Sequence, residues 1–393
     1  MTQDTVGIEP SQPAGGVSAA VPARDTAPRR LVAPEGLEPR HRAGGVLTQT
    51  VVPAFRAVYG VVSTNFTVII LLAILAAILG VLAQGGPTLM GNQMRNALVL
   101  GAIYALIAIG YTMVYGIIEL INFAHGDVFT LSGFYAFLIA GHFGLNTLAT
   151  SGGPGLVVAL VIIFAVSMVL AGFTGVLIER VAYRRLRDAP RLAPLITAIG
   201  VSFLIEGFML AFFGPDNVPT GQASWINGGA IKLGSVSVGW SDLFVVVMAL
   251  VLMFALGAFV NRTRLGKAMR STAQDRQAAL ICGININRTI STTFFIGSAL
   301  AAAGAVIYSI HYGDLKWNLG FHIGIIAFTA AVLGGIGNIV GAGIGGFLIG
   351  MVYVFGGSLA GGAWSESLIF AMLVLILTFR PVGLFGVDVA TRS

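Results

Sequence analysis

Ten apolar stretches follow one another from residue 67 to near the C-terminus, and they constrain the fold more than any other feature. A helix needs about 20 mainly apolar residues to cross the hydrocarbon layer of a bilayer. Only 10% of the 393 residues are charged, whereas soluble domains carry about 25%, so lipid must cover most of the surface. The stretches lie at residues 67–84, 97–117, 128–143, 156–178, 195–213, 243–260, 293–311, 324–336, 340–356 and 365–380.

The predicted fold is therefore an all-α membrane protein, a polytopic bundle of about eight to ten transmembrane helices, some of them short or broken. The count stays open because the eighth and ninth stretches are short and Gly-rich, and they form either two half-spans or one broken helix. In this tract Gly337, Gly341 and Gly345 are spaced four residues apart, which favours close helix packing.

Basic residues predict the orientation. Five arginines crowd residues 180–191, and six Lys or Arg residues crowd residues 262–288. Cytoplasmic loops carry the excess of Lys and Arg, so with ten spans both loops and both termini are predicted to be cytoplasmic. This topology accounts for the net charge of +6, and no nucleic-acid partner is predicted.

Residues 1–60 differ from the rest because they contain seven prolines and no apolar run. Such a segment cannot bury enough apolar surface to offset its ordering entropy, and it is predicted to be a disordered cytoplasmic tail. The transmembrane domain is predicted at 61–386, with a short cytoplasmic tail at 387–393. Cys282 is the only cysteine, and no catalytic residue or metal site is predicted.

A polar segment, Asn122–Asp127, interrupts the apolar pattern between the second and third stretches. Asp127 is placed to cap the following helix and Gly126 to permit a sharp turn. The alternative is a broken-helix element that lines a translocation path. Glu206, the one acid deep inside a predicted span, is expected to face the bundle interior. The candidate path residues are Asn122, Phe123, His125, Gly126, Asp127 and Glu206.

The loop at 261–292 is predicted to contain a short helix that ends at Gly283, a residue suited to a helix C-terminus. Met269, Ala273 and Leu280 are expected on one side of it. Such an apolar stripe needs either a protein partner or anionic head groups to cover it. The chain has no G-x-x-x-x-G-K-[ST] motif, so any ATP hydrolysis must occur on another chain.

Several long sequence words occur in order at 104–108, 110–116, 121–126, 178–184 and 327–337. Together they resemble the permease of high-affinity branched-chain amino acid ABC importers, over about residues 90–386. The resemblance implies that the loop at 261–292 is a coupling helix that inserts into a groove of an ATPase subunit. The coupling residues that it implies are Gly266, Arg270, Asp275, Arg276, Ala279 and Gly283.

The resemblance also implies a function and a set of partners. We expect a non-enzymatic subunit without a cofactor of its own, in a bacterial inner membrane, that imports branched-chain or related small amino acids. Its expected partners are two ABC ATPase subunits that use ATP, a second permease subunit (identical or related), an extracytoplasmic substrate-binding protein and membrane lipid. The alternatives are an ABC permease for urea or another small polar solute, and a self-sufficient secondary transporter.

Overall fold

The computed structural model describes residues 52–187, 189–190, 192–226 and 229–386, and side chains within these ranges except at 52–59, 61 and 233. The chain divides into two compact units, Met1–Phe55 and Arg56–Ser393. Most of the predicted tail at 1–60, and the segment 387–393, lie outside the described residues. Residues 52–60 differ from the prediction because they belong to a helix, where Pro53 occupies a first-turn position that proline tolerates.

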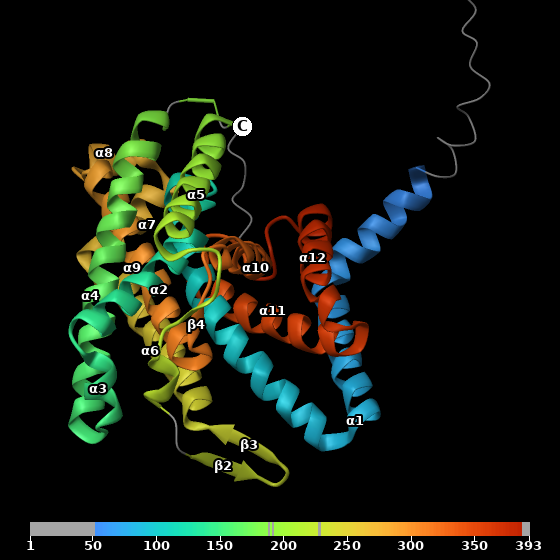
Figure 1. Ribbon diagram of the computed structural model, residues 1–393. Helices are drawn as coiled ribbons and strands as arrows, with labels where there is room; N and C mark the ends of the chain where they lie inside the picture. Colours follow the sequence, from blue (N-terminus) through green and yellow to red (C-terminus); the bar gives the residue numbers. More distant parts are fainter. Residues whose placement is uncertain (1–51, 188, 191, 227–228, 387–393) are drawn as a thin grey trace, which may run out of the picture. The chain divides into compact units, whose positions relative to one another are not determined.

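The second unit is almost entirely helical (Figure 1). The helices are α1 (Val52–Ile118), α2 (Ala124–His142), α3 (Leu145–Thr150), α4 (Gly153–Ile178), α5 (Leu192–Phe213), α6 (Trp240–Arg262), α7 (Arg264–Gln274), α8 (Arg276–Ile281), α9 (Ile286–Tyr312), α10 (Leu319–Gly334), α11 (Ile339–Ala360) and α12 (Ser365–Phe379). Shorter helical turns are η2 (Glu179–Tyr183), η3 (Arg184–Leu186), η4 (Gln222–Ser224) and η5 (Gly362–Trp364). The strands are β1 (Val218–Pro219), β2 (Ala230–Leu233), β3 (Val236–Gly239) and β4 (Asp314–Leu315).

The predicted class is confirmed, because every predicted apolar stretch lies in or overlaps one of these helices. Among the described residues, seven helices are long and apolar enough to cross a membrane. The first of them, α1, contains two predicted stretches and bends sharply at Gly86, whose φ of 67° is readily adopted only by glycine. Pro87 follows directly and lacks the amide hydrogen that would continue the hydrogen-bond ladder.

The two short stretches at 324–336 and 340–356 prove to be separate helices. α10 has only 16 residues and α11 has 22. They pack on each other at glycines: a Cβ atom on Gly345 would lie 2.9 Å from the Gly334 nitrogen. α11 also contacts α1, where a Cβ atom on Gly350 would lie 2.6 Å from the Gly101 Cα. The close packing predicted for the glycine tract thus occurs within one chain.

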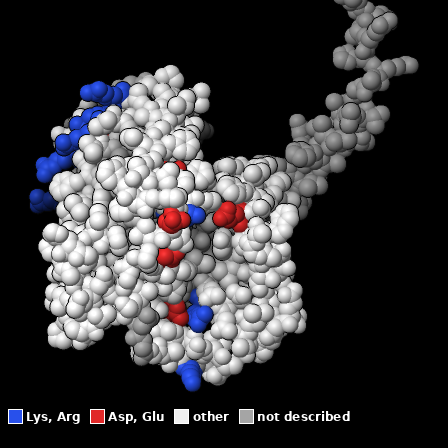
Figure 2. Space-filling view, viewed as in Figure 1, with Lys and Arg blue, Asp and Glu red and all other residues white. Residues whose placement is uncertain are grey.

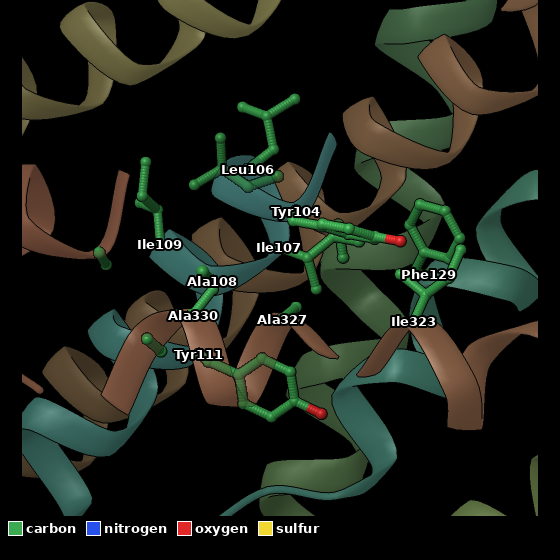
Figure 3. Close-up of a cluster of buried hydrophobic side chains, with 14 of the residues drawn as sticks. Tyr104, Leu106, Ile107, Ala108, Ile109, Tyr111, Phe129, Ile323, Ala327 and Ala330 are labelled. Carbon is green, nitrogen blue, oxygen red and sulfur yellow. The ribbon is translucent and has the colours of Figure 1, made fainter. Parts of the chain in front are cut away.

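The core is built around two helical segments that are buried on all sides, residues 101–114 of α1 and 297–307 of α9. Figure 3 shows side chains of α1 beside Phe129 of α2 and beside Ile323, Ala327 and Ala330 of α10. Gly, Ala and Ser dominate the α9 segment, and small residues let membrane helices approach closely where no hydrophobic effect drives them together.

One end of the unit, here called the basic end, carries η2, η3, α7, α8 and the start of α9. Lys and Arg side chains gather there along one edge in Figure 2. The strands lie at the other end: β1 pairs with β4 and β2 pairs with β3, both antiparallel. The Arg95 guanidinium donates to the Ser237 carbonyl oxygen at 2.7 Å and so fixes the β2–β3 hairpin against α1.

Candidate functional site

The polar segment singled out in the sequence lies at a break between α1 and α2. α1 ends at Ile118 and α2 begins at Ala124. Glu119 directly follows α1 and has a φ of 56°, the one positive φ of a non-glycine residue in the described parts of the chain. The left-handed conformation costs an ordinary L-residue about 1–2 kcal/mol, so the surrounding packing must hold the break in place.

Asn122 ties this break to the basic end of α4. Its side chain is buried, and its Oδ1 accepts a hydrogen bond from the Tyr183 hydroxyl at 3.0 Å. Tyr183 belongs to η2, the π-helical turn that continues α4, and its ring is also buried. The contact therefore joins two segments that are 61 residues apart in the sequence.

Asp127 does not cap α2, which corrects the sequence-based prediction. The N-cap position is Phe123, and Asp127 lies inside the first turn, fully buried. Its Oδ2 accepts a hydrogen bond from the Ser202 hydroxyl on α5. Asp127 is thus an acid buried inside the helical bundle. Glu206 is also buried, as predicted, and lies one turn beyond Ser202 on α5.

Gly126 forms no turn, and this too corrects a prediction. It lies in α2, where the backbone of α10 comes into direct contact with it. A Cβ atom on Gly126 would overlap the Gly320 carbonyl oxygen and would lie 2.7 Å from the Gly324 Cα. The glycine is therefore required by a helix crossing, because any side chain would push the two backbones apart.

His125 and Phe123 complete the segment with ring contacts. The His125 imidazole is buried and meets the Tyr111 ring edge to face, with centroids 4.7 Å apart. A Cβ atom on Gly110 would lie 2.5 Å from the His125 Nε2, so Gly110 leaves the space that the imidazole fills. Phe123 lies 6.2 Å from Phe328 of α10, measured between ring centroids.

These contacts define a buried cluster, here called the α2 junction, in which the first turn of α2 meets α1, α4, α5 and α10. None of its residues lines either of the two cavities described below. The arrangement resembles a packed joint more than the wall of a channel. The junction consists of Tyr111, Asn122, His125, Gly126, Asp127, Tyr183, Ser202, Gly320 and Gly324.

The loop at 261–292 contains two helices, α7 and α8, where the sequence predicted one. Asp275 separates them and caps α8, because its Oδ1 accepts from the backbone amides of Gln277 and Ala278 at 2.8 and 3.0 Å. Gly283 ends the loop helix as predicted, with a φ of 80°. The Ile284 amide donates to the Ala279 carbonyl at 3.0 Å, as in a Schellman motif.

The apolar stripe predicted on this loop is wrong for two of its three residues. Met269 is buried, but Ala273 and Leu280 are exposed, while Ala279 is buried against the unit itself. The break at Asp275 rotates α8 relative to α7 and so accounts for Leu280, whereas Ala273 lies within α7 and is exposed there. The apolar surface that α8 presents consists of Leu280, 63% exposed, and Ile281, 87% exposed.

The other predicted coupling residues hold the loop in place. Gly266 is buried because α7 turns back onto α6: a Cβ atom there would lie 2.6 Å from the Val260 Cα. Arg270 donates to the Asn261 Oδ1 at 2.8 Å. Arg276 donates to the carbonyl oxygen of Ile117 at 2.8 Å and so connects α8 with the end of α1, next to the break.

A cavity of about 410 Å³ lies toward the end that carries the strands, and the sequence reading missed it. Polar groups from α1, α9 and α11 converge on it, including Gln93, His311 and Tyr353. His311 Nδ1 is 3.7 Å from the Asp242 Oδ1, and that carboxylate also lies 3.7 Å from the Arg95 Nε. The signal in the sequence was a set of single polar residues at span ends, which no local pattern connects.

Comparisons of the sequence with known proteins identify the family. Residues 93–377 match the sequence profile of the family described as branched-chain amino acid transport system / permease component. The chain belongs to this family. It is a permease subunit of a transport system, and the resemblance predicted from the sequence words is confirmed. No solved structure matches the chain.

Two similar proteins cover most of the permease. The high-affinity branched-chain amino acid transport system permease protein BraD of Pseudomonas aeruginosa is 42% identical over 297 residues, which is 75% of this chain and 95% of BraD. Its counterpart LivH of Escherichia coli K12 is 39% identical over 298 residues, again 75% of this chain and 95% of LivH. A more distant relative is the autoinducer 2 import system permease protein LsrC of an Enterobacter species, 27% identical over 51% of this chain and 56% of its own length.

Two variants of the permease test the contact between α2 and α5. Asp127→Ala should destabilise the permease by about 1–3 kcal/mol, because the buried Ser202 hydroxyl loses its acceptor. Asp127→Asn keeps an acceptor oxygen and should retain most of the stability. Thermal unfolding and uptake in reconstituted vesicles measure the two effects. If Asn is as damaging as Ala, the carboxylate charge matters more than the hydrogen bond.

The contact between Asn122 and Tyr183 predicts a coupling energy. Asn122→Ala and Tyr183→Phe should each lower uptake while ATP hydrolysis by the partner subunits continues, because the α2 junction loosens while α7 and α8 are unchanged. The double variant should be less damaging than the sum of the two, with a coupling of about 0.5–3 kcal/mol in thermal unfolding. Strictly additive losses would contradict the assignment.

Proposed function

We propose that this permease imports branched-chain amino acids as one subunit of an ABC importer, driven by ATP hydrolysis on separate ATPase subunits. The observation that carries the proposal is the apolar tip of α8, formed by Leu280 and Ile281, on the basic end of a chain that has no nucleotide-binding motif of its own. Leu280 and Ile281 are neighbours outside the membrane-spanning helices, and an apolar surface on such a helix needs a partner to cover it.

The tip is held rigidly enough to transmit force. Asp275 caps the start of α8, and the Schellman motif at Gly283 closes its end. The buried Ala279 anchors the helix on the unit. A partner that moves the tip therefore moves α8 as a whole, and with it the Arg276 guanidinium.

Arg276 connects this movement to the α2 junction. Its bond to the Ile117 carbonyl lies one residue before the end of α1, and Asn122 holds the other side of the break to Tyr183. Displacement of α8 would shift the end of α1 at the break and rotate the first turn of α2. Asn122, Phe123, His125, Gly126 and Asp127 then act as a joint that opens and closes a path, and Glu206 lies beside that joint on α5.

The polar cavity of about 410 Å³ is our proposed outer part of that path. Its hydroxyl, amide and imidazole groups suit a small solute with a charged ammonium and carboxylate group. The end with the strands faces the extracytoplasmic side in this proposal, and a soluble binding protein delivers the solute there. Both termini and the basic end are then cytoplasmic, in agreement with the bias of Lys and Arg.

The subunit composition is part of the proposal. Two ATPase subunits each receive one α8 tip, and a second permease, identical or related, supplies the second tip. The substrate class rests on BraD and LivH, whose names assign them to branched-chain amino acid transport.

The experiment is reconstitution of the permease with its ATPase subunits and its binding protein in vesicles, followed by uptake of labelled leucine, isoleucine and valine. We expect accumulation against a gradient that needs both ATP and the binding protein. Labelled urea, supplied in parallel, should not accumulate. Uptake that proceeds without ATP but collapses with the ion gradient would instead identify a secondary transporter.

A further inference from the structure

A second cavity, of about 520 Å³, lies at the basic end between α4 and α9. It belongs neither to the α2 junction nor to the α8 tip. Its lining changes in character along its length: aromatic and aliphatic side chains at one side, and guanidinium, amide and hydroxyl groups at the other. The lining residues are Phe173, Val176, Arg180, Arg184, Asn285, Asn287, Arg288, Ser291, Thr292 and Phe295.

The apolar side of the cavity lies within the span of α4. Phe173 is 63% exposed, and its ring meets Phe295 edge to face with centroids 5.6 Å apart. Leu177, further along α4, and Val181, in η2, are also exposed. Exposed side chains of this kind on a transmembrane helix face hydrocarbon, so the cavity is open to acyl chains.

The polar side carries more positive charge than the protein neutralises. Glu179 is fully buried and accepts hydrogen bonds from both Arg184 and Arg187. Among the described residues, no carboxylate forms an ion pair with Arg180 or Arg288, which are both exposed at the cavity rim. The Glu179 carboxylate is thus shared by Arg184 and Arg187, and the positive charge that remains at the rim attracts an anion.

The surroundings of the rim are preorganised. Glu179 and the Ser291 hydroxyl hold the Arg184 guanidinium, with the Arg184 Nη2 at 2.9 Å from the Ser291 Oγ. Arg187 is fixed by the Asn287 Oδ1 at 2.5 Å. Because these partners fix the Arg184 guanidinium before any ligand arrives, an anion bound there would lose little free energy to ordering that side chain.

From these contacts we infer that the cavity between α4 and α9 binds an anionic phospholipid. Its phosphate lies among Arg180, Arg184 and Arg288, and its acyl chains lie along Phe173 and Phe295. Basic pockets between transmembrane helices are suited to anionic head groups. A free phosphate would use the same arginines, but it would make no contact with the exposed Phe173 or the half-buried Phe295.

The test uses the full-length permease purified from nanodiscs that contain equal amounts of phosphatidylglycerol and phosphatidylcholine. Native mass spectrometry then counts the lipids that stay bound. We expect selective retention of phosphatidylglycerol. Arg180→Gln combined with Arg288→Gln should weaken retention by roughly thirtyfold, since each basic side chain near a membrane surface contributes about a fivefold effect. The matched control, Arg185→Gln with Arg262→Gln, removes the same charge from the same end outside the cavity and should retain the lipid.

A second variant and a competitor separate the remaining outcomes. Phe173→Ala should lower retention of long-chain phosphatidylglycerol more than that of a short-chain form. Displacement of the lipid by millimolar inorganic phosphate would identify a free-phosphate site and overturn the inference. Equal retention in the cavity variant and in its control, or equal retention of both lipids, would overturn it as well. None of these readouts depends on transport, so the proposed function can fail without affecting the inference about the lipid.

Discussion

Replacing Gly126 with alanine is expected to abolish uptake by the permease. The added Cβ atom would overlap the Gly320 carbonyl oxygen and would lie 2.7 Å from the Gly324 Cα, and both neighbours are backbone atoms of α10. No rotamer change can relieve such a contact. Overpacking of this kind costs about 1–3 kcal/mol or more, and it would also displace Asp127, the acceptor for Ser202, since α2 must move away from α10.

The matched control is Gly141→Ala in the same helix, where an added Cβ atom would meet no atom within 4 Å. Alanine favours a helix over glycine by about 1 kcal/mol, so this variant should be at least as stable as the native permease. Thermal unfolding and uptake measure both variants. Normal uptake by Gly126→Ala would show that α2 and α10 are not held at this distance.

Changing Leu280 and Ile281 together to aspartate is expected to separate the permease from its ATPase subunits. Each side chain contributes about 1.5–3 kcal/mol when it is fully buried at an interface, so loss of both should weaken the association by at least about a hundredfold. Co-purification of the ATPase on a tagged permease measures this effect, and uptake should fall in parallel. Membrane insertion should be unchanged, because both side chains are largely exposed on the unit.

The control for added charge is Ile231→Asp with Ser237→Asp, which places two acids on the exposed β2–β3 hairpin at the other end. This variant should still retain the ATPase. If the α8 variant co-purifies with the ATPase as well as the control does, the tip instead lies on lipid head groups, the alternative that the sequence left open.

The spans could be predicted from the sequence because their signal is local. A run of about 20 apolar residues is sufficient for a membrane helix, and the ten predicted stretches all correspond to helices. The same holds for the helix end at Gly283, where a glycine with positive φ closes the helix. Orientation rests on the positive-inside rule and stays a prediction.

The α2 junction could be located from the sequence but not understood. The segment Asn122–Asp127 stands out as polar, and local rules suggested a cap and a turn. Its real partners, Ser202 and Gly320, are 75 and 194 positions further along the chain. A helix crossing of this kind leaves no periodic pattern in a single sequence. The sequence alone does not distinguish a glycine that forms a turn from one, such as Gly126, that lets a neighbouring backbone approach.

In the coupling loop, a single wrong helix boundary led to a wrong prediction of which side chains share a face. The sequence predicted one helix, so Leu280 was expected beside Met269. Asp275 instead ends one helix and starts another, and the faces of the two are out of phase. Helical periodicity predicts which side chains share a face only within an uninterrupted helix.

The conformation of Glu119 has a consequence for biogenesis. A local sequence that favoured a break would have glycine at this position, whereas glutamate tolerates the left-handed region poorly. The break is therefore a product of tertiary contacts, and an isolated peptide that covers residues 105–135 should continue as one helix in a lipid environment. Nascent permease would then insert this region unbroken, and the break would appear only when α4, α5 and α10 have arrived to hold it.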